Sequence, residues 1–526
     1  MRDFHLPGRS QVLAANGMCA TSHPIAAKVA IDMLQAGGNA ADAAIAAALV
    51  LGIAEPQMCG IGGDCFVLIK PAGEERIVAL NGSGHAPAGM DGARLRARGL
   101  TSVPTESAHA VTIPGAIDAF CRLSADWGRR ELAETLAPAI RYAEEGIPVA
   151  PRVSYDWARN VGRLSGEARR FFAAVGAAPA EGAIFRAPGQ AEVLRRIART
   201  GRAGFYEGEV AADMAASLKA LGGSHTEADF AATACRYDAP ISGPAQGYEL
   251  VEHPPNGQGA TALLLLNILS HFDLAALDPR GAARVHLEAE AAKLAYDARD
   301  RFIADPDHTK RLAHMLAPET AARLAALIDP TRAMEVPLRP VEAIHRDTVY
   351  LTVVDRDRMA VSLIYSIYFS FGAGLASSKF GVLFHNRGAG FTLTEGHPNE
   401  AGPGKRPMHT IIPAMLRKAG RVVMPFGVMG GDYQPSGHAA FVTNLATYGM
   451  DPQSAIDAPR SFWDAGEMQI ERGFGPEVAA ELAAKGHNVV LRESPLGGAQ
   501  AIEIDAERGV LCGASDPRKD GCALGY

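Results

Sequence analysis

Thr348 stands at the head of an alternating β-type segment, residues 348–354, about two thirds of the way along the chain. If the chain is cut before this residue, the threonine gains a free α-amine beside its own hydroxyl. One residue would then carry both the nucleophile and the base of a covalent reaction. A threonine that begins a strand is ordinarily structural, so spacing alone does not single out Thr348.

Two strands are predicted around this threonine, residues 348–354 and 359–366, joined by a charged turn at residues 355–358. A nucleophile at the start of a strand is held in place by the hydrogen bonds of the sheet, while its N-terminal side stays accessible. Upstream, two prolines at residues 337 and 340 disfavour helix and predict an extended connector that ends at Asp347.

The rest of the chain predicts a mixed α/β protein. Residues 22–56 indicate two packed helices, the first capped by Ser22 and the second, residues 40–54, rich in small residues that permit close packing on a sheet. Residues 131–333 are mostly helical in pattern, with a β-type interruption near residues 248–251. The glycine run at residues 60–63 lacks the GK[ST] ending of a phosphate loop and precedes a strand, so a structural turn is predicted there.

Composition excludes several function classes. The chain has 526 residues, 48% apolar and 21% charged, with a net charge of −7 and no basic run, which argues against a nucleic-acid surface. Its seven cysteines are scattered without a CxxC pair, so neither a disulfide framework nor a structural zinc site is expected. The N-terminus has no apolar signal region, and the longest apolar run, residues 40–54, is too short to span a bilayer, so a cytoplasmic location without membrane contact is expected.

No metal or organic cofactor is predicted. There is no HExxH motif, and His286 with Glu288 lacks a second histidine at the required spacing.

A set of short motifs follows one another in a fixed order over nearly the whole chain. They lie at residues 17–24, 37–44, 55–56, 60–63, 137–140, 204–209, 253–255, 405–407, 430–431 and 525–526. In this collinear arrangement the chain resembles the γ-glutamyltranspeptidase family of N-terminal-nucleophile hydrolases. The resemblance implies a four-layer αββα sandwich and self-cleavage between Asp347 and Thr348. The products would be a large subunit, residues 1–347, and a small subunit, residues 348–526, intertwined in one globular body that could form a dimer of heterodimers.

The resemblance also implies roles at the reaction centre. The freed α-amine of Thr348 would be the general base, and Thr352 and Ser366 would hydrogen-bond around it. Gly430 and Gly431 would donate backbone N–H groups to the tetrahedral oxyanion, a role that suits glycine because no side chain blocks close approach.

The chain departs from the transpeptidase pattern where the family reads its substrate. Ser83 stands where an arginine binds the glutamyl carboxylate, and both acids that hold the α-ammonium are absent from residues 386–391, where Arg387 adds a positive charge. A serine pair is replaced by His409 and Thr410, and an asparagine by Tyr368. The predicted substrate-binding residues are Ser83, His85, Tyr368, Arg387, His409 and Thr410.

These changes favour a small anionic amide without an α-ammonium, similar to the substrate of the oxamate amidohydrolase branch, which acts in purine-ring nitrogen breakdown and gives oxalate and ammonia. A γ-glutamyl hydrolase or transpeptidase acting on glutathione-like substrates is the alternative. A catalytically silent binding protein on the same fold, and an enzyme for other amides including β-lactam side chains, also stay open.

Overall fold

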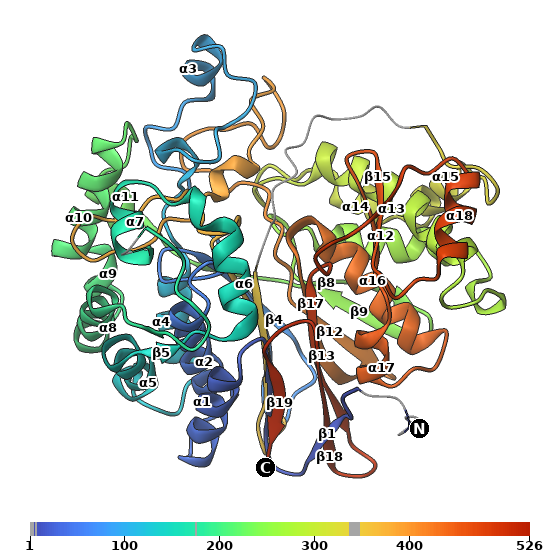
Figure 1. The fold of residues 1–526 in the computed structure, drawn as a ribbon, viewed down its shortest axis with the longest axis horizontal. Coiled ribbons are helices and arrows are strands. Elements are labelled where there is room, and N and C mark those ends of the chain that lie inside the picture. The colour runs from blue at the N-terminus through green and yellow to red at the C-terminus, as the bar shows by residue number, and fades with distance from the viewer. Residues whose placement is uncertain (1–4, 6–7, 174–175, 336–347) are drawn as a thin grey trace.

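The computed structural model describes residue 5 and residues 8–173, 176–335 and 348–526, so Asp347 and most of the predicted connector lie outside the described part. Two seven-stranded sheets stand face to face in the middle of the molecule, with helices on both outer sides (Figure 1). Every strand pairing within these two sheets is antiparallel. The arrangement confirms the predicted αββα sandwich.

Both sheets combine strands from before and after Thr348. In spatial order the first sheet contains β19 (Cys522–Gly525), β2 (Met18–Thr21), β10 (Val349–Val354), β11 (Ala360–Ser366), β3 (Asp64–Lys70), β4 (Val78–Gly82) and β7 (Arg236–Asp238). The second contains β1 (Val12–Ala14), β18 (Val510–Ser515), β17 (Gly498–Asp505), β13 (Arg421–Met429), β12 (Ala414–Lys418), β9 (Tyr248–Glu252) and β8 (Ile241–Ala245). Smaller sheets are formed by β14 (Ser461–Asp464), β15 (Glu467–Ile470) and β16 (Val489–Leu491), and by β5 (Ile147–Pro148) and β6 (Ile184–Phe185).

The helices divide between the two outer layers (Figure 1). Beside the first sheet lie α1 (Pro24–Gln35), α2 (Ala40–Ala54), α4 (Ala116–Trp127), α5 (Leu132–Glu145), α8 (Pro188–Thr200), α9 (Ala203–Tyr206), α10 (Gly208–Ala220) and α11 (Glu227–Ala232). Beside the second sheet lie α12 (Gly259–Leu269), α13 (Ala282–Phe302), α14 (Leu312–Leu316), α15 (Pro318–Ala325), α16 (Gln434–Ala446), α17 (Pro452–Asp457) and α18 (Pro476–Ala484). Three further short helices are α3 (Gly92–Ala97), α6 (Pro151–Asn160) and α7 (Gly166–Phe172).

The predicted helix pair at residues 22–56 is confirmed as α1 and α2, with one correction at its start. His23, and not Ser22, caps α1, because its Nδ1 accepts a hydrogen bond from the backbone N–H of Ile25 at 3.2 Å. The Ser22 hydroxyl instead donates to the carboxylate of Glu55 at 2.5 Å. A capping box between Asn39 and the third helical residue starts α2.

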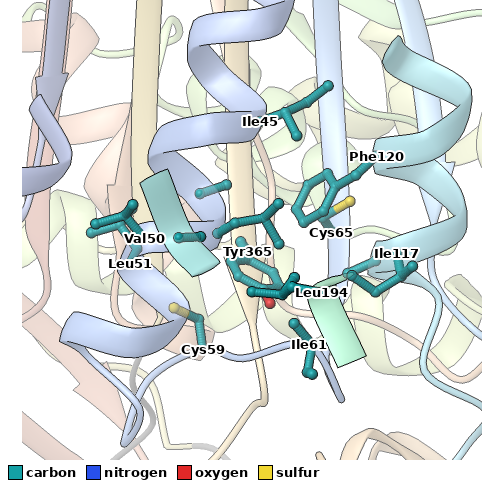
Figure 2. Close-up of a cluster of buried hydrophobic side chains, with 14 of the residues drawn as sticks. Ile45, Val50, Leu51, Cys59, Ile61, Cys65, Ile117, Phe120, Leu194 and Tyr365 are labelled. Carbon is teal, nitrogen blue, oxygen red and sulfur yellow. The ribbon is translucent and has the colours of Figure 1, made fainter. Parts of the chain in front are cut away.

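All residues of α2 are buried, since the helix lies between the first sheet and the outer helices. Figure 2 shows Ile45 from α2, Phe120 from α4 and Tyr365 from β11 converging in this core. The rings of Phe120 and Tyr365 meet edge to face, with centroids 5.3 Å apart. A Cβ at Gly52 would lie 3.5 Å from the Tyr365 hydroxyl, so the small residues let the helix approach the sheet closely.

The glycine run at residues 60–63 is a tight turn that leads into β3. A Cβ at Gly62 would lie 2.2 Å from the Leu383 carbonyl oxygen, and one at Gly63 would lie 2.5 Å from the Ser366 carbonyl oxygen. Close backbone packing beside Ser366 therefore requires glycine here, and the predicted structural turn is confirmed. Among the described helices, none has both the length and the apolarity needed to cross a membrane.

Candidate active site

Thr348 immediately precedes β10, a central strand of the first sheet. Its side chain is buried, with 1% of the residue exposed. In the β10–β11 ladder Val349 lies opposite Tyr365, which brings Thr348 beside Ser366 at the end of the next strand. The Thr348 hydroxyl donates to the Ser366 Oγ at 3.2 Å. The register thus fixes the predicted nucleophile against a hydroxyl from the neighbouring strand.

Ser366 connects Thr348 to a buried arginine. Its Oγ accepts hydrogen bonds from the Tyr368 backbone N–H at 2.9 Å and from Nη2 of Arg387 at 3.2 Å. Arg387 is fully buried, and its Nη1 donates to the Thr410 hydroxyl at 2.9 Å. Ser366 therefore lies between a buried cationic group and the hydroxyl of Thr348, and contacts both.

Tyr368 forms a platform for this arginine. Its ring centroid lies 4.1 Å from Cζ of Arg387, a cation–π contact that orients the planar guanidinium. The residue lies beyond β11 with a φ of +79°, in the left-handed region that costs free energy for a bulky side chain. The tyrosine is thus turned out of the strand direction and over the arginine.

Asp64, at the head of β3, lies opposite Ser366 in the β3–β11 ladder. It is fully buried, and its Oδ1 accepts from the backbone N–H groups of Gly84 at 3.1 Å and Gly115 at 2.9 Å. These bonds tie three separate segments of the chain together underneath the site. A buried carboxylate satisfied in this way is a rigid support.

The other oxygen of Asp64 faces two buried histidines. Oδ2 lies 3.3 Å from Nε2 of His409 and 3.5 Å from Nδ1 of His385. Burial alone would raise the pKa of Asp64, but His385, His409 and Arg387 outweigh it and lower the pKa to about 2. The carboxylate is therefore ionised at neutral pH.

Neither predicted substrate-binding histidine carries charge at neutral pH. Burial, reinforced by Arg387, lowers the pKa of His409 to about 3. Burial and the nearby Arg406 lower the pKa of half-buried His85 to about 4. Of the positive groups predicted for the pocket, Arg387 is therefore the one that remains charged.

The Gly430–Gly431 turn lies between β13 and α16. The φ angles of +122° and +58° put both residues in a region that favours glycine. The Gly431 carbonyl accepts from Nε2 of Gln258 at 3.0 Å. Arg299 supports the turn through two hydrogen bonds, which it donates to Oε1 of Gln258 at 2.8 Å and to Oδ1 of Asp432 at 2.5 Å. The turn predicted to hold the oxyanion is thus fixed by a buried polar network.

Two other predicted site residues have partners of their own. The Ser83 hydroxyl accepts from Nδ2 of Asn256 at 3.0 Å, next to the backbone of residues 405–407. The Thr352 hydroxyl donates to the Val361 carbonyl at 3.0 Å, inside the β10–β11 ladder. Thr352 lies four residues along the strand from Thr348, about 13 Å away at 3.3 Å per residue, so the hydrogen bond to Thr348 implied by the resemblance is not formed.

Sequence reasoning missed three residues that support this site, Asp64, Gln258 and Arg299. The signal for Asp64 was its place directly after the glycine run, where an acid begins an apolar strand. Gln258 and Arg299 gave no comparable signal, because their partners are distant in the sequence.

Comparisons with known proteins extend over nearly the whole chain. The gamma-glutamyltranspeptidase family model matches residues 26–526. A glutathione hydrolase-like proenzyme (YwrD) of Bacillus subtilis is 36% identical, covering 98% of this chain and 99% of its own. An oxamate amidohydrolase proenzyme of Klebsiella pneumoniae is 35% identical, covering 98% of this chain and 100% of its own.

A solved structure agrees over the same extent. The crystal structure of a cephalosporin acylase from Bacillus halodurans superposes with a TM-score of 0.92 at 37% identity, covering 100% of this chain and 99% of that one. The chain belongs to the gamma-glutamyltranspeptidase family and is an enzyme of its self-processing, N-terminal-nucleophile amidohydrolase type.

Proposed function

We propose that the chain cleaves itself between Asp347 and Thr348 and then hydrolyses a small anionic amide, oxamate, through the new N-terminal threonine. The Thr348 hydroxyl would attack the Asp347 carbonyl, and the C–N bond between the two residues would break to give an ester and a free α-amine. Water would then hydrolyse the ester, which releases the Asp347 carboxylate and restores the Thr348 hydroxyl. Residues 1–347 and 348–526 would stay together, because each central sheet contains strands of both. A dimer of this unit and a cytoplasmic location stay predictions.

In turnover the Thr348 hydroxyl attacks the substrate carbonyl while its α-amine takes the proton. An α-amine has an ordinary pKa of about 7.7–8, so an appreciable fraction is neutral near pH 7. The N–H groups of Gly430 and Gly431 would stabilise the oxyanion, ammonia would leave, and water would hydrolyse the acyl-enzyme. Ser366, which accepts the Thr348 hydroxyl at 3.2 Å, would orient the nucleophile.

The observation that carries the substrate proposal is the position of Arg387. Its guanidinium and the Thr348 hydroxyl share one partner, the Ser366 Oγ, at 3.2 Å each. A carboxylate bound by Arg387 would therefore lie close to the carbonyl under attack. In oxamate the carboxylate is bonded directly to the amide carbonyl, which suits this short separation. In a γ-glutamyl substrate three carbon atoms separate the two groups.

Charge supports the same choice. A γ-glutamyl substrate brings an α-ammonium, which needs an acceptor. Asp64, an acid whose charge is felt by Arg387, is already engaged by two backbone N–H groups. Placing an ammonium beside the Arg387 guanidinium would add like-charge repulsion in a buried site. One relative, YwrD, is a glutathione hydrolase-like proenzyme, so the test below also includes a γ-glutamyl substrate.

The test compares three substrates on the purified, processed enzyme: oxamate, its neutral analogue oxamide, and γ-glutamyl-p-nitroanilide. Ammonia release is measured for the first two and nitroaniline for the third. We expect kcat/KM to be highest for oxamate, at least about 100-fold above the anilide, since a matched charge-assisted contact gives roughly 3 kcal/mol. Rapid turnover of the anilide with none of oxamate would contradict the proposal.

A further inference from the structure

A buried cluster of potential metal ligands is formed by α13 and the connection between α18 and β16. His286 and Glu290 lie one turn apart on α13, and His487 lies in the connection between α18 and β16. All three side chains are buried, and their donor atoms lie within 4.8 Å of one another. The local spacing considered in the sequence, His286 with Glu288, did not reveal this cluster because His487 is distant along the chain.

From this cluster we infer a zinc site formed by Nδ1 of His286, Nε2 of His487 and the carboxylate of Glu290. Two imidazoles and one carboxylate form a ligand set that zinc favours, with a fourth position left for water. Tetrahedral bonds of about 2.0–2.1 Å place donor atoms about 3.3 Å apart. The distances from His487 Nε2 are 2.8 Å to His286 Nδ1 and 3.9 Å to Glu290 Oε1, on either side of that value.

The hydrogen bonds outside the cluster orient its ligands. Nε2 of His286 lies 2.8 Å from the carbonyl oxygen of Asp329, which can only accept, so this nitrogen carries the proton and Nδ1 keeps its lone pair. A ligand histidine commonly donates its other N–H to a backbone carbonyl in this way. In the metal-free form His487 Nε2 donates to His286, and zinc binding requires its proton to move to Nδ1. No proton is lost in that tautomer change.

The charges facing the cluster come from Glu290, Lys293 and Lys485. Lys293 donates to Glu290 Oε1 at 2.6 Å and to the Met334 carbonyl at 2.9 Å, and Lys485 donates to the Pro330 carbonyl at 2.8 Å. A carboxylate offers about four lone-pair positions, so Glu290 can bind zinc while it accepts from Lys293 and from the Met334 backbone.

The site would join two segments that the proposed self-cleavage separates. His286 and Glu290 precede Thr348, and His487 follows it. Zinc would therefore connect the large subunit to the small one beside Met334, close to the end of the described large-subunit chain. The ligand geometry itself does not depend on cleavage, so the site can be tested in the uncleaved Thr348→Ala protein as well.

The experiment uses full-length protein purified without a histidine tag, washed with EDTA, and titrated with zinc against a chromophoric chelator. We expect the wild type to bind one equivalent and His487→Gln to bind at least about 100-fold more weakly, since loss of one of three protein ligands removes a large share of the coordination free energy. The matched control His308→Gln changes an exposed histidine and should bind as the wild type does.

Two further readouts separate metal binding from a purely structural role. Zinc should raise the Tm of the wild type and of His308→Gln but leave that of His487→Gln unchanged. Cobalt added to the EDTA-washed wild type should give the intense visible bands of a four-coordinate ion, a measurement that needs no variant to fold. Equal zinc affinity of wild type and His487→Gln, or absence of these cobalt bands, would overturn the inference.

Discussion

Replacing Arg387 with methionine removes the buried cation beside Thr348 while keeping an unbranched apolar side chain. The guanidinium donates to Thr410 at 2.9 Å and to Ser366 at 3.2 Å, so it is held in place before substrate arrives. Truncating one partner of a buried, hydrogen-bonded charge pair costs about 2–5 kcal/mol. At roughly 3 kcal/mol, Arg387→Met should lower kcat/KM for oxamate on the order of 100-fold, since 1.4 kcal/mol is tenfold.

Oxamide distinguishes charge recognition from general damage to the site. This neutral analogue presents the same scissile carbonyl without a carboxylate, so Arg387→Met should change its kcat/KM far less. Arg159→Met, which removes an exposed guanidinium whose ion pair with Glu493 is long at 3.9 Å, is the matched control and should behave as the wild type. Equal losses on oxamate and oxamide in Arg387→Met would refute carboxylate binding by this arginine.

Three further predictions concern the support of the site and the core. Ser366→Ala should lower kcat roughly 10- to 100-fold, because donors from three residues lose their acceptor, at a cost of about 1–3 kcal/mol in total. An unchanged kcat would contradict the orienting role of Ser366. Gly430→Ala should lower kcat about 10²–10³-fold with intact self-cleavage measured on a gel, because its Cβ would lie 2.9 Å from the Cα of Gly497 at a φ of +122° and displace the oxyanion donor. Burial raises the pKa of Glu55 to about 7, so the stability it contributes below its unfolded pKa is lost as pH rises through 7. In the wild type, the free energy of unfolding measured in urea should fall by about 3 kcal/mol between about pH 5 and pH 8, and Glu55→Gln should remove this fall. The same fall in Glu55→Gln would contradict the assignment.

Local pattern was enough to predict the elements that carry the nucleophile. Alternation predicted β10 and β11, and small residues predicted the close approach of α2 to the sheet. The pairing of these strands brings Thr348 beside Ser366, a contact that only the family resemblance had implied. These features depend on residues near one another in the chain. The spacing of such residues indicates which of them lie on the same face of a helix or strand.

The polar contacts that complete the site could not be predicted in this way. Asp64 is joined to His409 and Arg299 to Asp432 across more than a hundred residues of sequence. The charge states also depend on burial, which turned two predicted pocket histidines into neutral groups. The N-cap of α1 was assigned to Ser22 because its type suits a cap, but its hydroxyl binds a carboxylate that only the folded chain brings near.

The central claim is that the working nucleophile is Thr348 with its own free amine, and N-terminal sequencing of active, purified enzyme tests it most directly. We predict two polypeptides of roughly 36 and 19 kDa, scaled from 55.3 kDa for 526 residues, with the smaller one beginning Thr-Val-Tyr-Leu. Thr348→Ala should give one uncleaved, inactive polypeptide. Full activity in a preparation whose bond between Asp347 and Thr348 is intact, or a new terminus at a different residue, would contradict the account.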